Sequence, residues 1–150
     1  MERTAIDPMW DAPPRERLIT MPRVLPERTL GLVAAAWMID NLRQPNGPRA
    51  GEAFTPTPQQ IEFLMHMYAL NPDGSWVYNW AVRRLSKGAG KSPFAAALSM
   101  FEMLGPCRFD RWDDSSPLGV EGKAMAMAWI QVVATSEQQT KNTMRMVRAF

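Results

Sequence analysis

The chain has few of the residues that build metal centres and disulfides. Its 150 residues include one cysteine, Cys107, and one histidine, His66. A single thiol excludes a disulfide within the chain and any zinc site built from four cysteines. So little cysteine is compatible with a reducing compartment. His66 falls off the apolar side of its predicted helix, so we expect an ordinary surface histidine.

Long apolar runs and a strong charge of one sign are also missing. The longest apolar run covers residues 30–39, whereas a helix that crosses a bilayer needs about 20 residues. No apolar stretch follows a basic start at the N-terminus, so we expect no signal peptide, no membrane and a cytoplasmic location. Seventeen basic residues against 15 acidic ones give a net charge of +2, which by itself does not indicate nucleic-acid binding. The apolar fraction of 46% suffices for the core of one domain.

Prolines divide the first part of the chain. The sequence holds 13 of them, and each removes a backbone donor and restricts the residue before it. We predict an irregular arm over residues 1–28, a helix over 29–44 and a loop over 45–56. Residues 1–50 therefore form a predicted proline-rich arm and helix, and residues 51–150 a second unit.

The second unit begins with a well-marked helix. Thr57 is the predicted N-cap, Pro58 occupies the first helical position, and Gln60 completes a capping box. Beyond this helix the pattern alternates between elements: a strand over 76–84, a helix over 91–104, a polar loop over 106–123, a buried strand over 127–135, and a basic helix from Ser136 to the end of the chain. This order predicts an α/β fold with a parallel sheet flanked by helices.

The segment between the first predicted strand and its helix carries the chemistry. It consists of Lys87, Gly88, Ala89, Gly90, Lys91 and Ser92. Glycines let backbone amides approach phosphate oxygens, and the helix N-terminus adds free amides and a partial positive charge. Lys91 can reach the β- and γ-phosphates, and the Ser92 hydroxyl can bind Mg²⁺. We therefore predict a variant Walker A loop for ATP and Mg²⁺, with Leu85 where the usual pattern has glycine. The alternative is an ordinary glycine turn with a solvated lysine.

Other polar residues give weaker signals. The Gln60 amide can pair with the N6 and N7 edge of adenine, but its place in the capping box favours a purely structural role. Asp113 and Asp114 follow no apolar strand, so we expect a solvated loop there and not a Walker B motif. The basic face of the last helix is suited to DNA phosphates, although a solvated face is the simpler interpretation; it comprises Lys141, Arg145 and Arg148.

These motifs together resemble the large terminase subunit of tailed bacteriophages, especially of phages that infect actinobacteria. The resemblance rests on residues 57–61, 78–92, 104–110 and 130–142 within about residues 50–150. It implies a P-loop NTPase fold and an ATP-driven motor that packages double-stranded DNA into a procapsid in the host cytoplasm. It also implies that Gln60 reads adenine, that residues 87–92 cradle the triphosphate, and that Lys87 and Lys91 are catalytic. The implied partners are a small terminase subunit, a portal protein and further copies of the chain.

Parts of the terminase pattern are missing. We find no Walker B strand after residue 140 and no cluster of nuclease carboxylates, so we expect the N-terminal part of an ATPase domain that binds ATP weakly and does not hydrolyse it. The interpretation also requires a β-element ahead of residues 87–92. The alternatives are another P-loop ATPase, such as a helicase-like protein, and a non-catalytic nucleotide-binding or assembly module.

Overall fold

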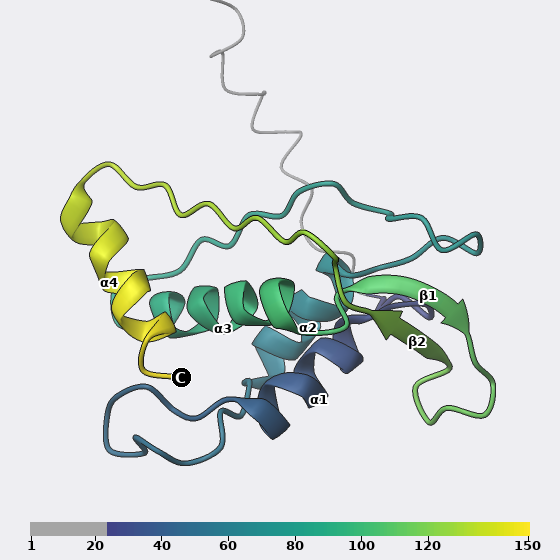
Figure 1. The fold of residues 1–150 in the computed structure, drawn as a ribbon, viewed down its shortest axis with the longest axis horizontal. Helices are drawn as coiled ribbons and strands as arrows, with labels where there is room; N and C mark the ends of the chain where they lie inside the picture. Colours follow the sequence, from purple (N-terminus) through teal and green to yellow (C-terminus); the bar gives the residue numbers. More distant parts are fainter. Residues whose placement is uncertain (1–23) are drawn as a thin grey trace, which may run out of the picture.

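The computed structural model describes residues 24–150, so most of the predicted arm lies outside the described residues. The elements, in chain order, are α1 (Gly31–Asn41), α2 (Pro58–Met67), α3 (Lys91–Leu104), β1 (Arg108–Trp112), β2 (Val120–Lys123) and α4 (Glu137–Val147). Figure 1 shows α3 crossing the middle of the molecule, with α4 beside its start and the β1–β2 hairpin at the opposite side.

Local end signals position the helices as predicted. Thr57 caps α2 through a full capping box with Gln60. α3 runs over the predicted residues 91–104 and ends at Gly105. Ser136 caps α4, which ends at Val147, before the end of the chain. The helix predictions are therefore confirmed, with small differences at the ends of α1 and α4.

The core lies where α1 packs against both α2 and α3. Gly31 allows this packing, because a Cβ atom there would lie 2.5 Å from the backbone of Leu64 and Met65. At the other end of the chain, α4 packs on α3, and Phe150 sets its ring edge-on against Phe54, with 5.5 Å between centroids. The largest fully buried side chains are Phe101, Leu30, Met38, Leu42, Leu64 and Cys107.

The predicted P-loop-type parallel sheet is wrong. The sheet within residues 24–150 has two antiparallel strands, with Arg108 opposite Lys123 and Trp112 opposite Val120. It forms inside residues 106–123, which were predicted to be a loop. The sequence there looks polar because ion pairs link the exposed side chains across the hairpin, including Arg111 with Glu121.

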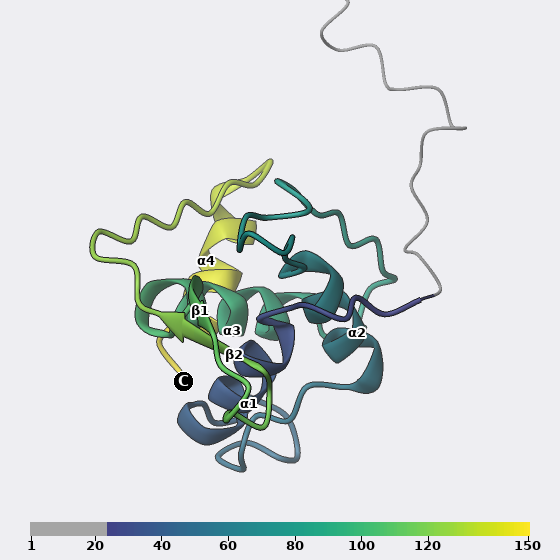
Figure 2. The same cartoon turned by 90° about the vertical axis from the view of Figure 1, so that its right-hand side faces the viewer.

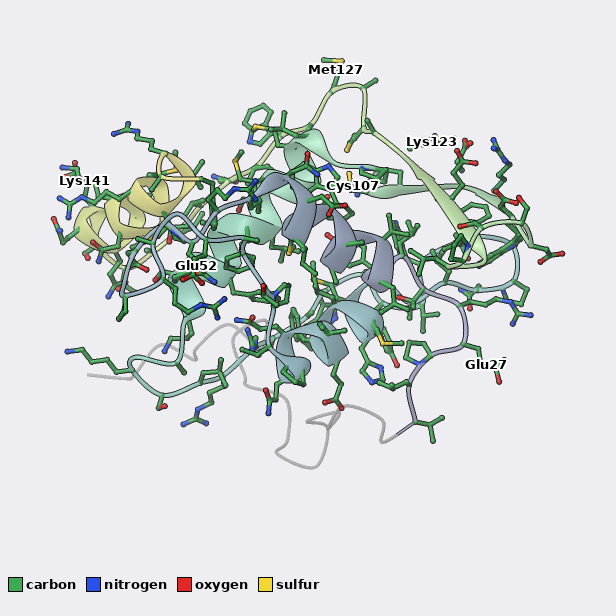
Figure 3. The ribbon with its side chains drawn as sticks, turned by 90° about the horizontal axis from the view of Figure 1, so that it is seen from below. Glu27, Glu52, Cys107, Lys123, Met127 and Lys141 are labelled. Atoms are coloured by element: carbon green, nitrogen blue, oxygen red, sulfur yellow. The ribbon has the colours of Figure 1, made fainter. Side chains whose placement is uncertain are left out.

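The two predicted strands, 76–84 and 127–135, form no ladder. Trp76 makes an isolated bridge with Leu70, and otherwise both segments lack strand pairing. Figure 1 shows both running along the top of the molecule, and the turned view in Figure 2 separates them. Several of their apolar side chains face solvent: Met127, which projects from the body in Figure 3, is 87% exposed. Alternating side chains make a segment extended, but a strand also needs a neighbour for its backbone groups.

Two further structural results concern His66 and the helices. His66 is 6% exposed, so the expectation of a surface histidine is wrong. Residues 24–28, 77 and 78 line an open pocket together with His66. Of the helices in residues 24–150, none has the length and apolar composition that crossing a membrane requires.

Candidate functional site

The predicted phosphate loop is a glycine turn that leads directly into α3. Gly88 and Gly90 have φ values of +87° and +70°, a region that favours glycine. The amide of Ala89 donates to the Ser86 carbonyl across the turn at 3.4 Å. A Cβ at Gly88 or Gly90 would meet nothing within 4 Å. The glycines are thus required by the backbone conformation, and open space lies in front of them.

The start of α3 differs from the starts of α2 and α4. Thr57 and Ser136 cap those helices with side-chain oxygens, whereas Gly90 is the N-cap of α3 and no side chain caps it. The first-turn amides of Lys91 and Ser92 are therefore available to an acceptor from outside the helix. A phosphate oxygen is suited to this position, because it also interacts favourably with the helix dipole.

Lys91 closes the loop on itself. Its Nζ donates to the carbonyl oxygens of Leu85 at 2.9 Å and Ser86 at 2.5 Å. Neither Lys87 nor Lys91 belongs to an ion pair within residues 24–150. Both cations are therefore free of carboxylate partners in the described part of the chain, and Ser92 is the adjacent hydroxyl on α3.

Gln60 lies on a different helix and has a clear structural role. Its side-chain Oε1 accepts from the backbone amide of Thr57 at 2.8 Å, and the backbone amide of Gln60 donates to the Thr57 hydroxyl at 3.3 Å. The capping interpretation is therefore confirmed. No hydrogen bond joins Gln60 to residues 87–92, and its Nε2 makes none within residues 24–150. Gln60 is 7% exposed and its Oε1 serves the cap, so pairing with both N6 and N7 of adenine would require the side chain to leave the capping box; the adenine-reading role stays a prediction.

The fold nevertheless brings the two predicted parts of the site to the same end of a helix pair. The rings of Phe63 and Phe94 lie 5.9 Å apart, and those of Tyr68 and Phe101 lie 5.5 Å apart. The second contact lies later in the sequence than the first on both helices, so α2 and α3 run in the same general direction. Their first turns, which carry Gln60 and Lys91, therefore lie at the same end.

The remaining polar candidates do not join this site. Asp113 accepts from the backbone and hydroxyl of Ser115, and these hydrogen bonds lower its pKa. Asp113 therefore lies in a polar turn that directly follows β1, whereas the sequence indicated no strand before it. The basic residues of α4 are exposed, including Lys141, which pairs with Glu137. Within residues 24–150, no three His, Cys, Asp or Glu side chains group closely enough to hold a metal ion.

The surroundings of two further side chains, Arg83 and His66, could not be inferred from the sequence. The guanidinium of Arg83 lies over the rings of both Phe63 and Phe94, although its sequence position shows only that it precedes the loop. His66 lines an open cavity of about 360 Å³ together with Arg28 and Tyr78. Both features depend on segments far apart in the sequence, and no local motif indicates them.

Comparison with known proteins relates the chain to bacteriophage proteins. It is 36% identical to the Gene 13 protein of Mycobacterium phage L5 over 138 residues, covering 79% of this chain and 23% of the relative. It is 35% identical to the Gene 13 protein of Mycobacterium phage D29 over 136 residues, covering 79% and 22%. The chain thus spans about a quarter of the length of these curated relatives, whose names state no activity. Neither a protein-family model nor a solved structure matches it.

Proposed function

We propose that residues 87–92 bind the phosphates of ATP with Mg²⁺ in a protein of bacteriophage origin. The observation that carries the proposal is the loop itself: two glycines with positive φ lead into the uncapped N-terminus of α3, where Lys91 begins the helix. Anions bind such helix starts through free amides and a lysine charge.

Each residue of the loop has a role in this proposal. The backbone amides around Gly88 and Gly90 cradle the phosphate oxygens. Lys91 exchanges its bonds to the Leu85 and Ser86 carbonyls for phosphate oxygens, and Lys87 adds a second cation. Ser92 holds Mg²⁺ through its hydroxyl. Bound Mg²⁺ would neutralise phosphate charge and polarise the terminal phosphoryl group.

The proposal does not depend on a sheet ahead of the loop. A β-element was required there by the motor interpretation, and residues 76–84 are extended without a ladder. The terminase resemblance therefore loses its strand–loop–helix support, and what remains is the loop, the start of α3 and the similarity to phage proteins. The DNA-packaging motor, and its assembly with a small terminase subunit, a portal protein and DNA, therefore rest on the resemblance of the sequence alone.

Titration calorimetry with Mg²⁺-ATP tests the loop directly. The wild-type chain should bind ATP, and Lys91→Ala should weaken binding about 10- to 150-fold, because a hydrogen bond to a charged group contributes about 1.5–3 kcal/mol. Lys123→Ala is the matched control: it removes the same charge on the hairpin, and its ion pair with Asp110 is surface-exposed. No binding by the wild type, or equal affinities for wild type and Lys91→Ala, would contradict the proposal.

A non-catalytic binding or assembly module is the second candidate. It is favoured by the lack, within residues 24–150, of any cluster of acidic or other metal-binding side chains, since hydrolysis uses carboxylates that orient Mg²⁺ and water. Phosphate release with Mg²⁺-ATP separates the two candidates for this chain. We expect binding without turnover from residues 1–150, and turnover from a protein of the relatives' length. Absence of turnover in the longer protein would favour the module.

A further inference from the structure

Arg83 connects the two parallel helices one turn beyond the residues of the proposed site. Its guanidinium carbon lies 4.6 Å from the ring centroid of Phe94 and 5.6 Å from that of Phe63. Phe63 is three residues after Gln60 on α2, and Phe94 is three residues after Lys91 on α3. The arginine therefore packs against the second turn of each helix, between the residue proposed to read the base and the loop proposed to hold the phosphates.

The surroundings of Arg83 show that stacking, and not an ion pair, holds it. Its Nη1 is closed to solvent and has no hydrogen-bond acceptor within residues 24–150. Burial lowers the pKa of the guanidinium. Aromatic rings attract a guanidinium that lies near them, and its planar shape gives contacts that an ammonium group does not reproduce. The contact therefore depends on the shape of arginine as well as on its charge.

Arg83 also belongs to the chain segment that leads into the loop. It stands four residues before Lys87, in the extended stretch without strand pairing. Without a ladder, side-chain contacts must fix this stretch against the helices. The stack on Phe63 and Phe94 is the described contact that ties it to α2 and α3 together.

We propose that Arg83 is a positioning residue that fixes Gln60 relative to the phosphate loop, so that the base and the phosphates of one nucleoside triphosphate are held together. This inference rests on the proposed function and deepens it. The ligand class it requires is a nucleotide, since a bare polyphosphate would need only the loop. Loss of Arg83 should therefore affect the base contact and leave the phosphate contact intact.

The test compares Mg²⁺-ATP with Mg²⁺-tripolyphosphate by titration calorimetry in the wild type, Arg83→Met, Arg83→Lys and Arg84→Met. Arg84 is the matched control, because it is adjacent, exposed and of equal charge. We expect the wild type to bind ATP more tightly than tripolyphosphate. Arg83→Met should weaken ATP binding about three- to tenfold and leave tripolyphosphate binding unchanged. Arg83→Lys should show an intermediate loss, and Arg84→Met none.

The other outcomes separate this inference from the proposed function. Equal losses for both ligands in Arg83→Met, or no loss, overturn the positioning role and leave the phosphate loop standing. Equal wild-type affinities for ATP and tripolyphosphate also overturn the positioning role and leave the phosphate loop standing, because the base then makes no contact. A wild type that binds neither ligand overturns both proposals. Circular dichroism checks the fold of each variant. If Arg83→Met is unfolded, the ratio of ATP affinity to tripolyphosphate affinity in Arg83→Lys decides: a ratio lower than in the wild type supports the positioning role, and an unchanged ratio overturns it.

Discussion

The hydroxyl of Tyr68 should contribute measurably to stability, because it is the buried link between α2 and α3 at the end opposite the proposed site. Tyr68 is the C-cap of α2 and is 2% exposed. Its hydroxyl donates to Oε1 of Glu102 on α3 at 2.5 Å, and Oε2 of Glu102 accepts from Arg108 at 2.8 Å. The three groups join α2, α3 and β1 in one network.

The substitution Tyr68→Phe isolates one bond of this network. It keeps the ring that packs edge-on against Phe101 and removes only the hydroxyl. Glu102 keeps its ion pair with Arg108, so no buried charge loses every partner. A hydrogen bond to a charged group contributes about 1.5–3 kcal/mol. Because the Glu102 side chain is 18% exposed, we expect a loss of about 2 kcal/mol in the free energy of unfolding.

Urea unfolding measures this loss, and the second tyrosine supplies the control. Tyr78 makes no side-chain hydrogen bond within residues 24–150, so Tyr78→Phe should change the free energy of unfolding by less than about 0.5 kcal/mol. The midpoint of Tyr68→Phe should fall with an unchanged dependence on urea. Equal midpoints for the two variants would refute the reasoning, because the Glu102 contact would then contribute nothing.

Two further predictions concern the same core. Burial, followed by the charge of Glu102, raises the pKa of Tyr68 above 10.0, and burial raises the pKa of Cys107 above 9.0. The unfolded chain therefore loses these two protons at a lower pH than the folded chain does. The stability that protonated Tyr68 and Cys107 contribute is fully present below their unfolded-state pKa values and is lost as the pH rises above them, so the free energy of unfolding should fall between about pH 9 and about pH 11. A flat profile in urea titrations over that range would exclude this linkage. Gly31→Ala should cost about 1–3 kcal/mol or more, because its Cβ meets the backbone of α2; thermal unfolding should show a clear loss, whereas the adjacent Leu32→Ala should have a small effect.

The helices could be predicted because their ends are encoded locally. Thr57 and Gln60 form the capping box of α2 from four consecutive residues, and Gly90 and Gly105 bound α3. The glycine turn that leads into α3 could be predicted for the same reason, since its glycines and Lys91 are contiguous; phosphate binding by this turn stays a prediction. Each signal needs only a few neighbouring residues, so the rest of the fold does not alter it.

The sheet and the side-chain contacts could not be predicted, because they depend on which segments meet. The alternation over 76–84 indicates extended backbone, but pairing requires a second segment at the right distance, and residues 127–135 do not supply it. The strands β1 and β2 do pair, yet their ion-paired side chains resemble a solvated loop. Arg83 and His66 were likewise missed, because distant segments create their surroundings.

The hydrogen bonds that Lys91 makes within the loop determine how many of its donors an anion could use. An ammonium group has three donors, and two of them serve the Leu85 and Ser86 carbonyls. One donor is therefore available to a phosphate without any rearrangement, and further contacts require that the loop release its lysine. These bonds are solvent-exposed, so water can replace the lysine at the carbonyls and the exchange costs little. The arrangement keeps the ammonium at the start of α3, where the free amides lie, and under the proposed function this preorganisation would favour phosphate binding there.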